Sequence, residues 1–574
     1  MKKWETIGKF KIEKGELRVE KLIDLLLENR NIKTKKEREE FLHPQLFDVT
    51  PKTVGIDLKQ LKKALVRIQK AIDDKEQIIV FGDYDVDGIT GSAILWETLH
   101  KMGAKVLPYI PHRVDEGYGL SKAGITNVSE QTPDIKLIIT TDNGIMAHEA
   151  VVFANEQNID VIITDHHTVG DKLPDAYAVV HTTKLCGAGV AYLLSKEIKT
   201  VIASKAKQSQ KEEIAASPSA PRNDTEEDIH LELATLGTVA DLVPLTGANR
   251  AIVKAGLKKL PKTKRLGLLE LYKNAEIEKD IFEPYEIGFV IGPRLNASGR
   301  IESAMDSLRL ICTTNRERAA ELAAKLELVN KERQQLLKEA KEHAIAQVQS
   351  EKFKIKSLLF VAHESYPQGV IGLVAGKLVE EFYRPAIVLS IGEVHSKASA
   401  RSVSGFNIIE FLRLHEEFFV NAGGHPMAAG FTVETIKLLD LQKALEDKAD
   451  EILTEDILTR RLKIDCELPF AAITKKFYEA ISQLAPFGMG NSEPVFATKR
   501  VFIDEIRIMG KDGSHLKLFL RQDKDIFEAI GFGLGALAAE LKVGDTIDVA
   551  YTIDENVWNG NTKLQLKIKD IKKI

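Results

Sequence analysis

Short apolar runs alternate with helical patterns in the first third of the chain. Residues 78–81, 137–141 and 161–164 are runs rich in Ile and Val that end in polar residues, which is typical of buried strands. Between them, apolar residues recur at helical spacing, as in 89–99. Strands that alternate with helices in this way predict a parallel α/β sheet between residue 78 and about residue 195.

Three further patterns follow along the chain. Residues 315–350 place Ala and larger apolar residues at helical spacing among dense charges, without Gly or Pro, which predicts one long amphipathic helix. From about residue 357 a second α/β pattern begins, with strands expected at 358–362 and 386–390. From about residue 460, short strands rich in Val, Ile and Phe alternate with turns, which predicts a small barrel.

These patterns predict five parts of the chain. They are an N-terminal helical segment (1–50), a parallel-sheet domain (51–314), a connecting helix (315–350), a smaller α/β domain (351–456) and a barrel domain (457–574). Within the second part, residues 203–228 are polar and lack aromatic side chains. Such a composition cannot bury enough apolar surface to fold, so we expect a disordered insert there.

Composition narrows the class of protein. The chain has 574 residues, 29% of them charged, and a formal net charge of −4, so any nucleic-acid contact must come from a local basic patch. Its three cysteines, Cys186, Cys312 and Cys466, are too few and too scattered for a disulfide framework or a zinc site. The N-terminus has no apolar signal core, and no run reaches the about 18 apolar residues of a membrane span. We therefore expect a soluble cytoplasmic protein without a membrane partner.

Acidic residues and histidines stand where the predicted strands end. The set is Asp83, Asp85 and Asp87 after the first strand, Asp142 after the second, Asp165, His166 and His167 at the end of the third, and Asp241 in a later apolar segment. The carboxyl ends of parallel strands meet at one edge of a sheet, so these side chains should converge. Crowded carboxylates repel one another unless cations lie between them, and mixed oxygen and imidazole ligands suit Mn²⁺ or Mg²⁺. The first acidic turn alone could equally be a solvated surface turn, but the whole set favours a dinuclear hydrolytic site.

Four short motifs carry a family resemblance. They are Asp-Tyr-Asp-Val-Asp-Gly (83–88), Thr-Asp-Asn-Gly (141–144), Asp-His-His (165–167) and Gly-Thr-Val-Ala-Asp (237–241). In this order they resemble the DHH phosphoesterase superfamily. From about residue 20 onwards the chain is similar to that superfamily's bacterial exonucleases, which degrade single-stranded DNA from 5′ to 3′. The resemblance implies a DHH domain, a DHH-associated domain and a C-terminal OB fold. It also implies a monomer that acts at the 5′ end of single-stranded DNA, with a single-strand-binding protein and a RecQ-type helicase as partners by analogy.

The resemblance further implies how two divalent ions, Mn²⁺ or Mg²⁺, would be held. One ion would bind Asp85 and Asp142, and the other Asp87, Asp142, His166 and Asp241, with Asp142 bridging them. Other members of the superfamily have a His where this chain has Phe81, and Asp83 or water is expected to replace that ligand. His167 would then bond a phosphate oxygen or assist protonation, with packing as the alternative. Asp165 is expected to orient His166.

Two regions outside the metal motifs predict contacts with nucleic acid. The candidates are Arg294, Asn296 and Arg300 in the first domain, and Ser399, Arg401, Ser402, Gly423, Gly424 and His425 in the second α/β domain. Glycines let backbone amides approach phosphate closely, and an Arg fork can bind phosphate through two hydrogen bonds. We expect Arg300, Ser399 and Arg401 to recognise a terminal 5′-phosphate, which carries more negative charge than an internal diester. The alternative is that Arg300 and Arg401 bridge the two domains by salt bridges.

Three functions are open at this point. The first is a metal-dependent 5′→3′ exonuclease that degrades single-stranded DNA to mononucleotides in DNA repair and recombination. The second is a DHH phosphodiesterase acting on short oligonucleotides or cyclic dinucleotides, but such relatives lack the C-terminal barrel. The third is a non-catalytic single-strand-binding DHH protein, which would require missing ligands, whereas all four motifs are filled here. The exonuclease is therefore the favoured prediction.

Overall fold

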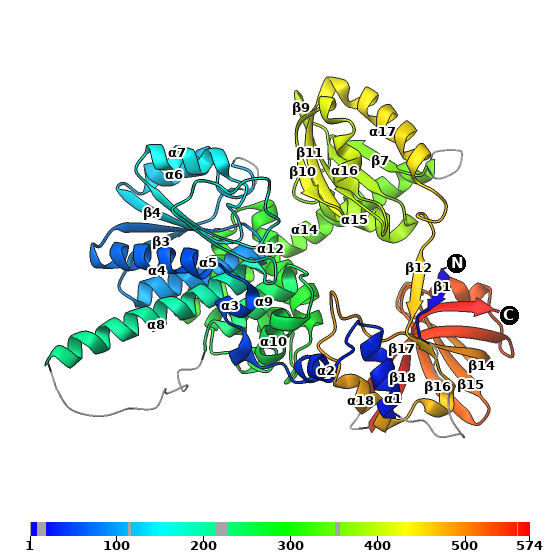
Figure 1. The fold of residues 1–574 in the computed structure, drawn as a ribbon. Helices are drawn as coiled ribbons and strands as arrows, with labels where there is room; N and C mark the ends of the chain where they lie inside the picture. Colours follow the sequence, from blue (N-terminus) through cyan, green and yellow to red (C-terminus); the bar gives the residue numbers. More distant parts are fainter. Residues whose placement is uncertain (1, 9–18, 113–115, 214–227, 351–355, 559–560) are drawn as a thin grey trace.

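The protein consists of a first α/β domain, a second α/β domain and a barrel domain (Figure 1). The first carries the residues of the predicted hydrolytic site and is called the catalytic domain below. The computed structural model describes residues 2–8, 19–112, 116–213, 228–350, 356–558 and 561–574. The long helix α14 (Arg316–Ser350) leads from the first domain to the second. Its first half packs Leu322 and Leu326 into the core of the catalytic domain, and its second half packs Ala344 and Val348 against the second domain. The predicted connecting helix is therefore one rigid element with a core at each end.

The catalytic domain is built on a parallel sheet with the strand order β3-β2-β4-β5-β6. The strands are β2 (Gln77–Phe81), β3 (Lys105–Tyr109), β4 (Ile135–Thr140), β5 (Asp160–Asp165) and β6 (Ala178–His181). All of β2 is buried because helices cover both faces of the sheet. Ile78 and Val80 face one core, and Ile79 and Phe81 face the other. The predicted parallel α/β fold is confirmed.

Helices cover the two faces of this sheet unequally. On one side lie α6 (Lys122–Gln131) and α7 (His148–Glu156), and on the other α4 (Leu58–Asp73), α5 (Val86–Lys101), α8 (Gly187–Glu213) and α9 (Leu231–Ala240). Helix α8 continues through Glu213, so the first part of the predicted disordered insert, 203–213, is helical instead. Turns of a helix that already has a buried start can extend without an apolar face, because propagation is far easier than nucleation. Residues 214–227 of the insert lie outside the described residues.

A second group of helices completes the catalytic domain. It contains α10 (Gly247–Gly256), α11 (Leu266–Asn274), a π-helical turn (Glu286–Ile291), α12 (Gly292–Ile301) and α13 (Met305–Cys312). Their apolar residues join the same core as α5 and α9, for example Leu268 and Leu295. This group therefore packs against α5 and α9, on the same face of the sheet.

The second domain contains a mixed five-stranded sheet with the order β10-β11-β9-β8-β7. Its strands are β7 (Leu359–His363), β8 (Ala386–Ser390), β9 (His395–Arg401), β10 (Phe419–His425) and β11 (Ala428–Glu434). Three helices, α15 (Ile371–Phe382), α16 (Ile408–Arg413) and α17 (Leu438–Ile452), accompany it. Strand β10 lies at the edge of the sheet, and most of its residues are exposed.

The C-terminal domain is a small closed barrel. It contains β13 (Cys466–Glu467), β14 (Phe496–Met509), β15 (His515–Gln522), β16 (Asp525–Gly531), β17 (Thr546–Trp558) and β18 (Asn561–Lys573), with helix α18 (Lys475–Ser482). Pairing of β14 with β17 closes the ring, which leaves no long free edge among these strands. The predicted OB-like barrel is confirmed.

The N-terminal segment packs against the barrel domain. Strand β1 (Lys3–Thr6) pairs in parallel with β12 (Arg461–Ile464), and the chain ends marked in Figure 1 lie close together. Helix α1 (Val19–Glu28) buries Leu22 and Leu26 in the barrel domain's core. Helices α2 (Lys35–Leu42) and α3 (Pro51–Val54) then lead into the catalytic domain.

One buried arginine joins three of these parts. The guanidinium of Arg250 in α10 is fully buried and donates to the carbonyl oxygens of Phe41, Leu484 and Ala485. It also lies 3.8 Å over the ring of Phe41. These bonds satisfy a charge that burial would otherwise make costly.

A membrane span is not found in the described ranges, since none of their helices is both long and apolar enough to cross a bilayer.

Candidate metal centre and phosphate pocket

The N-terminus of α5 carries the first two acids of the site. Asp85 caps this helix, and its Oδ1 accepts from the backbone N–H groups of Asp87, at 2.9 Å, and Gly88, at 3.1 Å. Asp87 accepts from the backbone of Gly187, at 2.6 Å, and Ala188, at 2.9 Å, at the start of α8. Two helix N-termini therefore stabilise these carboxylates, because their free N–H groups favour negative charge.

Asp142 stands directly beyond β4 in a strained backbone conformation. Its φ is +64°, in the left-handed region that residues other than Gly seldom occupy, and the residue is only 3% exposed. Asn143 holds the turn, since its side chain donates to the carbonyl oxygens of Phe81, at 3.2 Å, and Thr141, at 2.9 Å. At Gly187 a Cβ would lie 2.5 Å from the Cβ of Asp142, so only glycine allows α8 to begin this close.

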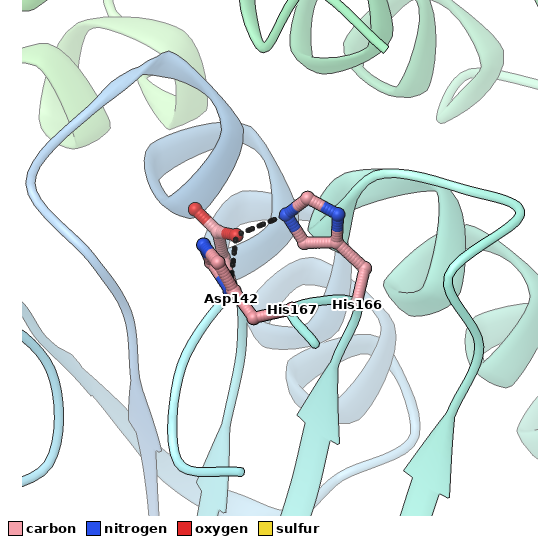
Figure 2. A group of neighbouring side chains, drawn as sticks. All are labelled: Asp142, His166 and His167. Atoms are coloured by element: carbon pink, nitrogen blue, oxygen red, sulfur yellow. Dashed lines mark ion pairs between the residues drawn. The ribbon is translucent and has the colours of Figure 1, made fainter. Parts of the chain in front are cut away.

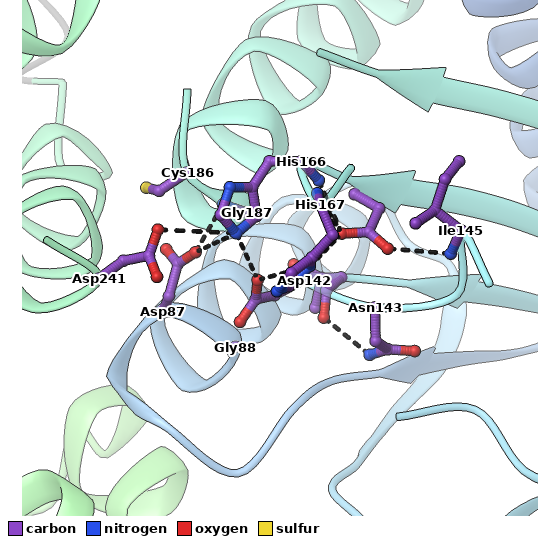
Figure 3. Close-up of polar contacts among 12 residues, drawn as sticks. Asp87, Gly88, Asp142, Asn143, Ile145, His166, His167, Cys186, Gly187 and Asp241 are labelled. Carbon is purple, nitrogen blue, oxygen red and sulfur yellow. Dashed lines mark hydrogen bonds and ion pairs between the residues drawn. The ribbon is translucent and has the colours of Figure 1, made fainter. Parts of the chain in front are cut away.

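His166 lies among three carboxylates contributed by different elements (Figure 3), and Figure 2 shows its contact with one of them, Asp142. Its Nε2 is 3.1 Å from Asp142 Oδ1, 3.6 Å from Asp241 Oδ2 and 3.8 Å from Asp87 Oδ2. Asp241 reaches the group from the C-terminal cap of α9. The strand ends and the later helix thus converge as the spacing of the motifs predicts.

Asp165 orients His167 rather than His166, which corrects the expectation from the sequence. Its Oδ1 lies 2.8 Å from His167 Nδ1 and also accepts from the backbone N–H of His166 at 2.7 Å. The imidazole two residues along can fold back onto the carboxylate, whereas the His166 ring points into the acidic cluster. Burial lowers the pKa of His167, but the hydrogen bond and charge of Asp165 outweigh it and raise this pKa.

Tyr118 is a site residue that the sequence motifs did not single out. Its hydroxyl lies 3.0 Å from the carbonyl oxygen of Asp142 and 3.2 Å from His167 Nε2. The signal available was its place in Gly-Tyr-Gly, within a polar loop between two predicted elements. On the other side of His167 lies the ring of His425, with 5.9 Å between the two ring centres. The second domain therefore contacts the acidic edge of the catalytic sheet, which we call the metal edge, at this point.

Three overlapping groups of these residues could each hold a cation. They are Asp142 with His166 and His167, Asp87 with His166 and Asp241, and Asp83 with Asp85 and Asp142. Asp142 belongs to two of the groups and His166 to two. Asp83 thus lies where the sequence predicts a substitute ligand, while Phe81 is buried in the sheet core.

The electrostatics of the groups fit divalent cations. Asp142 Oδ1, Asp241 Oδ2 and His166 Nε2 are buried atoms that have no hydrogen-bond partner among the residues that the structure describes. Burial, followed by the charges of Asp87 and Asp85, raises the pKa of Asp142 well above its usual range and that of Asp241 to about 9. Burial lowers the pKa of His166, which keeps its imidazole neutral and able to bind a metal. Cations between the carboxylates would relieve this repulsion.

The second domain forms a pocket of about 310 Å³ with basic and glycine-rich walls. Its lining includes Gly369, Gly372, Lys397, Ser399, Arg401, Gly423 and Gly424. Arg401 Nη1 donates to Ser399 Oγ at 3.0 Å. A Cβ on Gly372 would lie 2.9 Å from both Arg401 Nη2 and Ser399 Oγ, so glycine opens the space beside this pair. The pocket offers a guanidinium, a hydroxyl and nearby backbone to an anion.

The remaining predicted nucleic-acid residues make contacts within the protein. Arg294 pairs with Glu327 at 2.7 Å, and Asn296 Oδ1 accepts from the backbone N–H of Val86 at 3.0 Å. Ser402 is buried and donates to the carbonyl oxygen of Phe406 at 2.6 Å. Arg300 Nη1 donates to the carbonyl oxygen of Gly369 at 3.2 Å, which joins the two domains by a hydrogen bond to the backbone.

The chain matches three protein-family profiles, one in each domain. The DHH family, N-terminal domain, matches residues 77–218, the DHHA1 domain matches 351–454, and the RecJ OB domain matches 464–570. The order along the chain is that of the catalytic sheet, the glycine-rich pocket and the barrel.

Several relatives are similar over nearly the whole chain. The single-stranded-DNA-specific exonuclease RecJ of Bacillus subtilis is 37% identical over 569 residues, covering 97% of this chain and 68% of that protein. RecJ of Haemophilus influenzae is 30% identical over 575 residues, covering 96% of each. The crystal structure of RecJ in complex with Mn²⁺ from Thermus thermophilus superposes with a TM-score of 0.81 at 28% identity, covering 100% of this chain and 80% of that one. The chain therefore belongs to the RecJ family of the DHH superfamily.

Proposed function

We propose that the protein is a metal-dependent exonuclease that degrades single-stranded DNA from its 5′ end to mononucleotides. The observation that carries this proposal is the meeting of two complementary sites at one place. The acidic metal edge of the catalytic domain and the basic pocket of the second domain adjoin through His167 and His425. Relatives named single-stranded-DNA-specific exonucleases share both domains and the barrel.

Hydrolysis of a phosphodiester needs an activated water and neutralised phosphate charge. Bound divalent ions, Mn²⁺ or Mg²⁺, supply both by polarising the phosphoryl group and lowering the pKa of water. Asp85, Asp87, Asp142, His166 and Asp241 would hold the two ions, with Asp142 shared between them. Asp83 would complete the group that lacks a histidine.

His167 is placed to act on the substrate rather than on the metals. Asp165 binds its Nδ1 and fixes the ring, so that Nε2 faces the hydroxyl of Tyr118 and the open side of the site. With a raised pKa, the ring can remain protonated and donate to a phosphate oxygen or a leaving oxygen. Tyr118 would hold the ring in this orientation when no substrate is bound.

Polarity requires a group that recognises the end of the strand at a fixed distance from the metals. A carboxylate edge with bound cations would hold any phosphate, so the distinction must come from elsewhere. Arg401 and Ser399, together with the open backbone of Gly423 and Gly424, would bind the terminal 5′-phosphate. Arg300 would act differently from the sequence expectation, by holding Gly369 at the wall of that pocket.

Two other functions have weaker support. A phosphodiesterase for short oligonucleotides or cyclic dinucleotides would not need the barrel, whose family profile is specifically that of the RecJ OB domain. A non-catalytic binding protein would not need metal-type ligands from all four motifs gathered at one edge of the sheet. The expected monomeric state, cytoplasmic location, repair role and partnership with a single-strand-binding protein and a RecQ-type helicase stay predictions from the resemblance.

The direct test compares DNA substrates that differ at one end. A single-stranded oligonucleotide labelled at its 3′ end is incubated with the protein and Mn²⁺, with and without a chelator. The proposal predicts successive shortening from the 5′ end, release of mononucleotides, little cleavage of blunt duplex and no activity with chelator. Internal cleavage of a circular single strand, or equal degradation from both ends, would contradict it.

A further inference from the structure

Another cavity lies at the far end of α5 and α9, the two helices that carry metal ligands. It has a volume of about 850 Å³ and is lined by Trp96, Glu97, His100 and Lys101 at the C-terminal end of α5. Ile229 and Glu232 line it at the start of α9, whose far end carries Asp241. At about 1.5 Å per residue, the 16-residue helix α5 separates this cavity from the metal edge by roughly 20 Å. None of the proposed exonuclease residues lines it.

The cavity carries a local excess of positive charge. Its basic lining residues are Lys101, Lys258, Lys259, Lys262, Lys264 and Arg265, and its acidic ones are Glu97 and Glu232. Six cations minus two anions leave a net charge of +4, in a chain whose net charge is −4. Within the described part of the chain, Lys101, Lys258 and Lys262 form no ion pair, and all three are exposed. Such a concentration of lysines favours an anionic ligand.

The acids at the base of the cavity are already neutralised. Both oxygens of Glu97 accept from Arg265, at 2.7 and 2.9 Å, and Oε2 also lies 3.1 Å from His230 Nε2. Burial opposes ionisation of Glu97, but His230 and Arg265 lower its pKa to about 2. Glu232 accepts from the Thr263 hydroxyl at 2.7 Å. Both acids at the base therefore have polar partners, and Lys101, Lys258 and Lys262 form no ion pair with any residue that the structure describes.

An aromatic surface forms one wall. The indole of Trp96 stacks on the His100 imidazole with ring centres 5.2 Å apart and an angle of 13° between the planes. Trp96 is half-buried against the domain core, so its ring is held in place. Flat heteroaromatic groups bind to such surfaces by stacking, at about 1–3 kcal/mol per base in single-strand-binding proteins.

Helix α11 begins beside the cavity. Helix α11 begins at Leu266, which lines the cavity, and Arg265 at its N-cap provides no side-chain cap. Free N–H groups at the start of a helix favour phosphate oxygens. This feature adds to the lysines and the aromatic wall, and it lies on the same side as Arg265.

We propose that this cavity binds a nucleoside polyphosphate, with the base against Trp96 and the phosphates among Lys258, Lys262 and the start of α11. Its volume lies within the about 300–1,000 Å³ of small-molecule sites. The three lysines of residues 258–262 and Lys264 lie within seven positions, which suits a compact polyphosphate better than a strand that spreads its charge along a groove. The proposal does not depend on the exonuclease activity.

Direct binding to the full-length, metal-stripped protein tests the proposal. ATP, GTP, dAMP and inorganic tripolyphosphate are titrated by calorimetry, so that nucleotides cannot bind through metal at the acidic edge. We expect saturable binding of one ATP or GTP per chain and weaker binding of dAMP. The double substitution Lys258→Glu and Lys262→Glu should weaken ATP binding by at least about tenfold, because two charge-assisted contacts are lost.

Matched variants separate this cavity from other anion sites. Lys59→Glu with Lys62→Glu changes two exposed lysines on α4, away from the cavity, and should leave ATP binding unchanged. Arg401→Ala removes the guanidinium of the second-domain pocket and should also leave it unchanged. Trp96→Leu should weaken ATP binding but not tripolyphosphate binding, and a melting curve of each variant checks that it is folded.

Several outcomes would overturn the proposal. These are no saturable binding of any nucleotide, an equal loss in the α4 variant, or loss of binding in Arg401→Ala. Equal affinities for tripolyphosphate and ATP, both unaffected by Trp96→Leu, would make the cavity a general anion site and refute the nucleotide assignment. Tighter binding of an acidic octapeptide containing one Trp would instead assign the cavity to a protein partner.

Discussion

The catalytic sheet and the sheet of the second domain both present a polar site, but with opposite charge. At the edge of the first, the buried Asp87 and Asp142 and the half-buried Asp241 surround one imidazole. On the second, Arg401, Ser399 and glycines line an open pocket of about 310 Å³. Without cations, the carboxylates of the first site repel one another. The guanidinium and hydroxyl groups of the second site favour an anion. The proposed function thus assigns chemistry and end recognition to different domains, and it predicts that each can be removed without the other.

The largest effect should come from removing the shared ligand of the acidic edge. Asp142→Ala takes a carboxylate from two of the three ligand groups. We expect hydrolysis of single-stranded DNA to fall by more than about a hundredfold, since even residues that only support a metal ligand have effects of about 10–100-fold. Single-strand affinity, measured by fluorescence anisotropy with Ca²⁺ in place of Mn²⁺, should change little.

The control for this change is an acidic residue outside the ligand groups. Asp171→Ala alters an exposed carboxylate in the loop after His167 and should leave the rate within about twofold, as surface substitutions usually do. Near-normal turnover of Asp142→Ala would refute the shared-ligand assignment.

The next effect separates the two sites. Arg401→Ala should reduce the preference for a 5′-phosphate over a 5′-hydroxyl strand by about 10–100-fold, because a hydrogen bond to a charged group contributes about 1.5–3 kcal/mol. Bound Mn²⁺, measured by electron paramagnetic resonance, should be unchanged. Arg401→Lys keeps the positive charge but loses the paired N–H donors of the guanidinium, so it should restore only part of the preference for a 5′-phosphate. If both substrates slow by the same factor, Arg401 is a general phosphate contact or a structural residue.

The acidic edge also predicts how the metal-free protein responds to pH. The raised pKa values of Asp142 and Asp241 mean that the folded protein holds protons that the unfolded chain, with carboxyl pKa values near about 3.9, has released. The contribution of these two carboxyl groups to the free energy of unfolding is therefore fully present below about pH 4, and it is lost as the pH rises towards about 9. With chelator, the melting temperature should fall by several degrees between about pH 5.5 and 8.5, at about 2–4 °C per kcal/mol.

Bound cations should cancel this loss. With Mn²⁺, the same pH interval should leave the melting temperature level or raise it, because metal and protons compete for the same oxygens. Asp241→Asn should flatten the curve of the metal-free protein. A melting temperature that rises with pH in chelator would show that the carboxylates are not destabilised by one another.

The smallest effect is expected for residues 214–227, which have a largely polar sequence without aromatic side chains. Deleting them and joining the ends with a short Gly-Ser linker should leave the rate within about twofold, since such a composition can bury little apolar surface. The Asp87 contacts lie at the opposite end of α8, at Gly187 and Ala188. Loss of Mn²⁺ binding in the deletion would show that the segment supports the metal edge.

The strand pattern was enough to predict most of the fold and the convergence of the acids. Strands β4 and β5 each end directly before a ligand or its neighbour, so parallel topology alone brings Asp142 and His166 together. The partner of Asp165 could not be predicted in this way. Whether a carboxylate turns to His166 or His167 depends on side-chain rotamers, which neither spacing nor periodicity determines.

Long-range contacts account for the other differences. Nothing in Lys3–Thr6 indicates that it pairs with Arg461–Ile464, because a four-residue strand has no distinctive pattern. Arg250 looks like an ordinary helical arginine in the sequence, yet it is fully buried among the carbonyl groups of two distant segments. Tyr118 was missed for a related reason, since its hydroxyl meets His167 only after the loop has folded over the sheet edge.

The pairing of β1 with β12 has a consequence for synthesis on the ribosome. Roughly 450 residues separate Lys3 from Arg461, and at about 5–20 residues per second they take on the order of half a minute to a minute and a half to be made. During that interval α1 has no barrel against which to bury Leu22 and Leu26. The catalytic and second domains can fold meanwhile, but the beginning of the chain stays exposed until the barrel strands emerge. Nascent chains stalled before residue 496 should therefore be cleaved by protease within their first roughly 30 residues, and released chains should not.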